Sequence, residues 1–201
     1  MKLYVTFLPV LLLAATPASA ETQVMTEDTS RDCAFQLDLS DKSEIANWRV
    51  LLDGVMGGRS TGVRYAEDGA MTFKGEINTN GGGFSSLRRP MRPGMIGGAG
   101  SLDMRVKSDG RAYKLTFRTN ASRWGRSVSY QLDIPQTPKG KWTDVSLPLE
   151  GFRTSIFGRS VRAKPFDPKD VREMGIILAD GIDGPFEFNL KSLACDVAKV
   201  T

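Results

Sequence analysis

Three kinds of residue in this 201-residue chain could do chemistry: carboxylates, glycine-rich turns, and an arginine-rich segment that contains a tryptophan. Histidine is absent from the whole sequence. Its absence excludes Ser-His-Asp and Cys-His catalysis and histidine-ligated metals. Two cysteines are also too few for a cysteine-rich zinc site. The sequence therefore leaves few routes to an enzyme.

The first glycine-rich stretch reads DGVMGGRS and begins at Asp53. A Walker phosphate loop needs G-x-x-x-x-G-K-[ST], and a dinucleotide fingerprint needs G-x-G-x-x-G before a helix. The stretch has neither spacing, and strand-like sequence follows it. We expect Gly57 and Gly58 to form a tight bend, because glycine accepts positive φ and close backbone approach. Met56 is expected to turn inward as packing. Asp53 is expected to bind nearby amides, and Ser60 to fasten the exit.

Carboxylates could support hydrolysis or bind calcium. A glycosidase needs two carboxyl groups that face one substrate at a set separation, which no spacing here indicates. The acidic candidates are Asp53, Glu76, Asp103, Asp133 and Asp180. LADGIDGP, residues 178–185, offers oxygen ligands that calcium prefers but lacks the regular spacing of a calcium loop, so a plain turn is favoured. We predict no catalytic residue, no cofactor site and no metal site.

The segment RTNASRWGRS, residues 118–127, is the strongest candidate for binding a partner, and we interpret it as a loop. Arginine supplies forked donors for carboxylate, phosphate or sugar hydroxyls, and an exposed tryptophan supplies a flat apolar face. The alternative is a tryptophan packed at the core rim among solvated arginines. A second basic segment, residues 152–165 with Phe157, is interpreted as a long loop over one sheet. The candidate partner-binding residues are Arg118, Asn120, Arg123, Trp124 and Arg126.

The first 20 residues have the pattern of a secretory signal peptide: Lys2, a short apolar run, and an A-x-A site that ends at Ala20. The run is too short to span a bilayer, and an uncleaved anchor is the alternative. Cleavage after Ala20 predicts a periplasmic or secreted protein of 181 residues with a net charge of +3. So small a charge argues against nucleic-acid binding. No later segment is apolar enough for stable membrane insertion after cleavage.

Alternation of apolar and polar residues with period two dominates the rest of the chain. Turn signals such as Asp68-Gly69 separate the alternating segments, which favours an all-β fold of two stacked antiparallel sheets. Short helical turns are expected at residues 43–48, with Ser43 as a possible cap, and at residues 167–174. Residues 21–32 are polar and are predicted to be a flexible lead-in to a single domain, residues 33–197. The alternating segments are residues 70–77, 101–107, 111–119, 127–134, 144–149 and 184–195.

Cys33 and Cys195 lie near the two ends of the predicted domain. An exported chain meets an oxidising compartment. If the first and last strands are neighbours, one disulfide would join the ends. Closing a loop of about 160 residues would stabilise the fold by roughly 5 kcal/mol at most in the chain-entropy model. Two unrelated buried thiols are the alternative.

Several stretches together resemble the NADH:ubiquinone oxidoreductase (complex I) intermediate-associated protein 30 family. They occur in the family's order: Trp48, DGVMGGRS, GGFSSLR, YQLDIP, WTDVSLPLEGF and MGIILADGIDGPFEFNLKSL. The combination of Val-Met-Gly-Gly with the later Gly-Gly-Phe is specific, and the resemblance covers residues 35–193. The family-motif residues to which we assign structural roles are Trp48, Asp53, Met56, Gly57, Gly58, Ser60, Gly82, Gly83 and Phe84.

This resemblance implies a galactose-binding-domain-like jelly-roll β-sandwich, in agreement with the period-two alternation. It also implies a non-catalytic, chaperone-like assembly role, which the family's named member performs for respiratory complex I inside the mitochondrion. The export signal predicts a different compartment for this chain. We therefore expect an exported binding or assembly module with a protein partner. The alternative is a carbohydrate-binding module on the same scaffold, using Trp124 and the neighbouring arginines.

Overall fold

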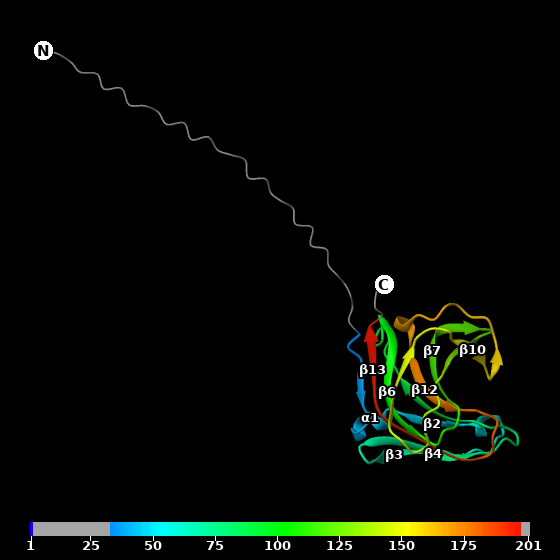
Figure 1. The fold of residues 1–201 in the computed structure, drawn as a ribbon. Coiled ribbons are helices and arrows are strands. Elements are labelled where there is room, and N and C mark those ends of the chain that lie inside the picture. The colour runs from blue at the N-terminus through cyan, green and yellow to red at the C-terminus, as the bar shows by residue number, and fades with distance from the viewer. Residues whose placement is uncertain (2–32, 198–201) are drawn as a thin grey trace.

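The computed structural model describes Met1 and residues 33–197. The predicted signal peptide beyond Met1 and the predicted lead-in, residues 21–32, lie outside the described residues. Two antiparallel β-sheets stack face to face in the described part of the chain (Figure 1). The all-β sandwich that the alternating pattern predicts is therefore confirmed.

One sheet has six strands, in the order β3-β4-β13-β6-β9, with β1 paired to β13 beside this path. Its long central strand, β13, collects pairings from β1, β4 and β6 and so joins segments distant in sequence. The strands are β1 (Gln36–Asp38), β3 (Val63–Glu67), β4 (Ala70–Ile77), β6 (Ala99–Ser108), β9 (Thr143–Pro148) and β13 (Gly184–Val197).

The other sheet has seven strands, in the order β11-β10-β8-β7-β12-β5-β2. Figure 1 shows this sheet strongly curled, with β10 at the upper right of the coloured ribbon and β2 towards its bottom. A cleft lined by residues of six of its strands hollows the outer face of this sheet. The strands are β2 (Arg49–Leu52), β5 (Ser85–Pro90), β7 (Tyr113–Arg123), β8 (Arg126–Asp133), β10 (Arg153–Ile156), β11 (Arg159–Ser160) and β12 (Glu173–Leu178).

The core fills the space between the sheets with alternate residues of each strand. In β7, Tyr113, Leu115 and Phe117 point inward and are buried, whereas the residues between them are partly exposed. Burying each such side chain stabilises the fold by about 1.5–3 kcal/mol. The large side chains that are almost fully buried include Trp48, Phe73, Phe117, Phe188, Tyr113 and Tyr130.

Within residues 33–197, helical structure is limited to three short turns, and two of the expectations about it are wrong. The helix α1 (Lys42–Ala46) is capped by Asp41 rather than Ser43: Asp41 accepts from the Ser43 amide at 2.8 Å. Only a 3₁₀ turn, η2 (Pro168–Asp170), forms where a helix to residue 174 was expected. From Glu173 onward the chain pairs with β5 and β7, because alternate apolar residues there suit a strand.

The predicted disulfide between Cys33 and Cys195 is present, with the two Cα atoms 6.0 Å apart. It forms because β1 pairs with β13, which places Gln36 opposite Ala194. The bridge closes a sequence separation of 162 residues. A structural disulfide is typical of proteins outside the cytosol. Separately, no helix within residues 33–197 is long and apolar enough to cross a membrane.

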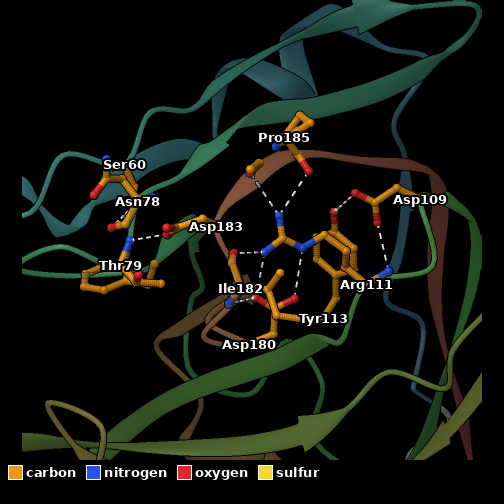
Figure 2. Close-up of polar contacts among 12 residues, drawn as sticks. Ser60, Asn78, Thr79, Asp109, Arg111, Tyr113, Asp180, Ile182, Asp183 and Pro185 are labelled. Carbon is orange, nitrogen blue, oxygen red and sulfur yellow. Dashed lines mark hydrogen bonds and ion pairs between the residues drawn. The ribbon is translucent and has the colours of Figure 1, made fainter.

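The turn at residues 179–185 is held by one arginine (Figure 2). Arg111 binds both carboxylate oxygens of Asp180, at 2.7 and 2.9 Å, and donates to the carbonyl oxygens of Gly184 and Pro185 at 3.0 Å. Burial raises the pKa of Asp180, but the hydrogen bonds from Arg111 outweigh it and leave the pKa below its usual value. Thr79 donates its amide to Asp183 at 2.6 Å. These carboxylates therefore fix the turn.

Candidate functional site

The glycine-rich stretch folds around the carboxylate of Asp53, which is fully buried. One oxygen accepts from the Ser60 amide at 3.0 Å. The other accepts from the Ser60 hydroxyl and the Gly83 amide, both at 2.6 Å, and from the Phe84 amide at 3.3 Å. The backbone amides of both glycine-rich stretches thus bind an anion of the protein's own. The expected roles of Asp53 and Ser60 follow directly from this geometry.

The glycines around Asp53 answer two different needs. Gly57 follows the 3₁₀ turn η1 (Asp53–Met56) with φ of 89°, in the left-handed region that glycine accepts. Gly58 and Gly82 instead face the Asp53 carboxyl group so closely that a Cβ atom on either would overlap it. The bend expected at Gly57 and Gly58 is therefore present. Its interior is filled by Asp53.

Met56 was expected to pack inward, but it does not, because the Asp53 side chain occupies the inside of the turn. Its side chain is 54% exposed. It lies at the edge of a cleft of about 390 Å³ on the hollow face of the seven-stranded sheet. Phe84 precedes β5 and also lines this cleft.

The floor of the cleft consists of outward side chains from neighbouring strands. Strand pairing places Arg118 of β7 opposite Ser129 of β8, and Thr116 opposite Gln131. On the other side of β7, its pairing with β12 places Glu173 opposite Arg118. We call the side of the cleft with Arg88 and Arg118 the charged half, and the side with Thr116, Ser129 and Gln131 the neutral half; Lys114 lines the cleft farther along β7. The polar side chains that line it are Ser86, Arg88, Lys114, Thr116, Arg118, Ser129, Gln131 and Ser155.

Beside the charged half, three arginines share one carboxylate, and two of them, Arg88 and Arg118, line the cleft. Glu173 lies 2.5 Å from Arg49, 3.2 Å from Arg88 and 3.5 Å from Arg118. The group carries three positive charges against one negative charge. Burial, followed by the charge of Arg118, lowers the pKa of the Arg88 guanidinium. An incoming anion would relieve this repulsion, so the cluster is suited to bind a carboxylate or a phosphate.

The predicted partner-binding segment is a hairpin rather than a loop. β7 continues to Arg123 and β8 begins at Arg126, so only Trp124 and Gly125 form the turn. A register irregularity between Arg118 and Ser122 helps the hairpin bend. The second basic segment, residues 152–165, likewise contains β10 and β11 instead of a long loop.

The five predicted residues of this hairpin occupy two places. Arg118 lies in the cleft, whereas the other four stand on the strand ends and the turn. Asn120 accepts from Lys164 at 2.6 Å. Arg123 stacks over the Trp124 ring at 4.5 Å, and Arg126 stacks over Phe157 at 4.9 Å. Trp124 is 73% exposed, so packing at the core rim, the alternative reading, is wrong.

Trp124 and Phe157 join Met56 in lining one hollow, and Met56 and Phe157 also border the cleft. We name these three residues the apolar rim. Trp124 and Phe157 have φ of 52° and 49°, in the left-handed region. The first position of such a two-residue turn ordinarily holds Asn, Asp or Gly. A large aromatic residue there strains the backbone.

Comparison with known proteins identifies the family. The model of the complex I intermediate-associated protein 30 family matches residues 37–190. The chain belongs to this family. A relative from Caenorhabditis briggsae, described as a probable complex I intermediate-associated protein 30, mitochondrial, is 31% identical over 93 residues. The match covers 44% of this chain and 27% of the relative, so the chain spans about a quarter of that protein. The Caenorhabditis elegans protein of the same description matches equally.

Solved structures share the fold of this intermediate-associated protein 30 family member. A family 11 carbohydrate-binding module from Clostridium thermocellum, in complex with a β-1,3-1,4-mixed-linked tetrasaccharide, has a TM-score of 0.58 at 16% identity. The similarity covers 81% of this chain and 96% of the module. A family 11 module of a cellulosomal cellulase from the same organism has a TM-score of 0.57 at 14% identity, covering 82% of this chain and 95% of the module. At such identities the likeness concerns the fold alone.

Sequence reasoning missed most of the arginine cluster that shares Glu173 beside the cleft. Arg49, Arg88 and Glu173 are far apart in the sequence and meet only because β2, β5 and β12 are neighbours. Each stands at an outward position of its strand, which the alternating pattern could have indicated. The order of the strands, on which the cluster depends, could not be deduced from that pattern.

Proposed function

We propose that this protein is an exported, non-catalytic binding domain with an assembly-factor-like role, and that it holds a partner protein in the cleft of the seven-stranded sheet. The observation that carries the proposal is the sharing of Glu173 by three arginines beside a hollow polar floor. The excess positive charge favours an acidic segment of the partner. Family membership supports a protein partner.

An extended acidic segment fits this cleft for a physical reason. Arginine binds carboxylates through paired donors, and Glu173 leaves part of the donor capacity of the cluster unused. The neutral half, with Thr116, Ser129 and Gln131, offers hydrogen-bond partners to a backbone. Residues 33–197 form the single binding domain in this proposal.

Affinity capture from the envelope fraction of the source cells, followed by mass spectrometry, tests the proposal. The bait begins at Glu21, and its Arg49→Gln/Arg118→Gln variant lacks two of the three arginines that share Glu173. The matched control is Arg105→Gln, because Arg105 pairs with the exposed Asp144 on the six-stranded sheet. We expect one complex to be retained by the bait and the control and lost by the cleft variant. Equal retention by the cleft variant would refute binding in the cleft.

Carbohydrate binding is the second candidate function. The hydroxyl and amide groups of Thr116, Ser129 and Gln131 on the floor favour it, and the fold is shared with modules such as the tetrasaccharide complex. Retarded migration through polysaccharide gels, abolished by Gln131→Ala, would support a sugar site on the floor. A sugar-induced fluorescence change that disappears in Trp124→Ala would place the sugar at the rim. Retention on polysaccharide without any retained protein would favour this candidate over the first.

Export through a cleaved signal peptide is the remaining part of the proposal. The disulfide between Cys33 and Cys195 supports an oxidising compartment, periplasmic or extracellular. The curated relatives are described as mitochondrial, so the compartment needs its own test. N-terminal sequencing of the protein from the periplasmic fraction should begin at Glu21. An intact N-terminus at Met1 would contradict cleavage.

A further inference from the structure

The apolar rim exposes three large side chains that come from three separate turns. Met56 follows β2, Trp124 joins β7 to β8, and Phe157 joins β10 to β11. Trp124 is 73% exposed and Phe157 is 67% exposed. Together with Met56 they surround one hollow beside the mouth of the cleft. The rim is therefore a set of apolar projections on one side of the molecule.

The turns at Trp124 and Phe157 do not require aromatic side chains. The hairpin between β3 and β4 makes its turn with Asp68 and Gly69, at φ of 50° and 68°. Trp124 and Gly125 repeat this turn at 52° and 72°, and Phe157 and Gly158 repeat it at 49° and 76°. Strain of this kind is retained where it serves a function. Aromatic rings that are exposed to water and carried on a strained backbone point to an apolar partner.

Unpaired positive charge surrounds the rim. Arg59, Arg123, Arg126 and Arg159 each lie within three positions of a rim residue. Among the residues that the structure describes, none of these four forms an ion pair. Residues 54–66, 119–132 and 154–166, which carry the three turns, contain no aspartate or glutamate. The charge complement of this surface is therefore an anion.

We propose that the apolar rim docks reversibly on an anionic lipid membrane. Met56, Trp124 and Phe157 enter the headgroup region, where aromatic and apolar side chains partition. The neighbouring arginines bind lipid phosphates at the same level, because Arg123 and Arg126 lie against the rings themselves. Apolar insertion and positive charge act together, as stable peripheral binding requires.

A membrane fits these observations better than a glycan or a protein. A guanidinium already covers one face of each aromatic ring, the kind of surface on which a sugar would stack. The apolar groups project from three turns, which suits insertion between lipids. Docking through the rim would also turn the mouth of the cleft towards the membrane surface. The inference uses a surface other than the arginine cluster, so it can fail while the proposed function holds.

Vesicle flotation tests the inference with the chain from Glu21, because the apolar run of residues 1–20 would itself bind lipid. The vesicles are phosphatidylcholine alone or phosphatidylcholine with about 30 mol % phosphatidylglycerol. We expect flotation with the anionic vesicles only, and its loss at about 0.5 M salt. Trp124→Asn/Phe157→Asn should weaken binding about tenfold or more. Each of Arg123→Gln and Arg126→Gln should weaken it about fivefold.

Asparagine is chosen because it accepts the left-handed conformation, so the rim variant should fold at least as well as the unaltered protein. Asp68→Asn is the matched control at the same kind of turn, and it should float normally. The cleft variant Arg49→Gln/Arg118→Gln should also float, which separates this inference from the proposed function. Absence of flotation, equal binding to both vesicles, or normal flotation of the rim variant would overturn the inference. The inference would also be overturned if the protein bound no vesicles but captured a partner protein through the rim.

Discussion

The hairpin between β3 and β4 and the hairpin between β7 and β8 make the same turn with different residues. Asp68 occupies the first position of one, and Trp124 occupies that position of the other, with φ of 50° and 52°. Aspartate is well suited to this conformation and tryptophan is not. The hairpin of β10 and β11 repeats the second choice with Phe157. Because the backbone is the same, the difference reflects what each side chain does outside the turn.

The comparison separates framework residues from rim residues. Framework residues such as Asp53 and Asp68 satisfy the local backbone, and their side chains bind or suit the turn that they form. Trp124 and Phe157 strain the backbone, and all three rim residues expose apolar surface. A change in the framework should therefore lower stability without a direct effect on lipid binding. A change in the rim should weaken lipid binding without lowering stability.

Asp53→Ala should give the largest effect, a loss of about 3–5 kcal/mol in the free energy of unfolding. The substitution leaves the buried amides of Ser60, Gly83 and Phe84 without their acceptor. Urea denaturation followed by tryptophan fluorescence measures it. Asp103→Ala, at an exposed position of β6, should change stability by less than about 0.5 kcal/mol. Similar losses in both variants would show that Asp53 is not a framework residue.

Reduction of the disulfide should give the next largest effect, a loss of about 3 kcal/mol. The bridge closes a separation of 162 residues, which restricts the unfolded chain strongly. Thermal melts with and without a reductant, and of a Cys33→Ser/Cys195→Ser variant, measure the loss. The bridge joins the two ends of the domain, so vesicle binding by the folded protein should stay the same. An unchanged melting temperature would contradict this role.

Acid should destabilise the framework through Asp53. Burial raises the pKa of its carboxyl group, but hydrogen bonds from Ser60, Gly83 and Phe84 outweigh it and lower the pKa. The stabilisation is therefore complete above the unfolded pKa of about 3.9 and is lost as the pH falls through the lower folded value. Asp53→Asn should reduce the slope of the unfolding free energy below pH 4 by up to about 1.4 kcal/mol per pH unit. An unchanged slope would mean that Asp53 does not control it.

The sequence predicts the framework better than it predicts the cleft. The alternation in residues 70–77 gives β4 with its observed bounds, and the Asp53 turn follows from short-range glycine spacing. The position of Cys195 beside Cys33 needed only one assumption about neighbouring strands. The sharing of Glu173 instead depends on strand order across the sheet. Met56 was expected inside because its side chain is apolar. That property alone cannot reveal that Asp53 occupies the interior of the turn.

Asp68→Trp places a large aromatic residue at the first position of the β3–β4 turn, the position that Trp124 and Phe157 occupy in their own hairpins. The substitution should cost about 1–2 kcal/mol, because a bulky residue disfavours the left-handed conformation. Chemical denaturation measures the cost, with Asp68→Asn as the control that keeps a suitable residue. The same loss in both variants would show that the Asp68 carboxylate, and not the turn preference, matters.

Trp124→Asn makes the opposite exchange and should give the smallest change, a gain of about 0.5–1 kcal/mol. Asparagine accepts the φ of 52° that strains tryptophan, and the exposed ring contributes little packing to the core. The gain is reduced by loss of the stacking with Arg123. Chemical denaturation of the variant beside the unaltered protein measures it. A loss of stability would mean that Trp124 supports the fold, and the distinction between framework and rim would then fail at the residue that defines it.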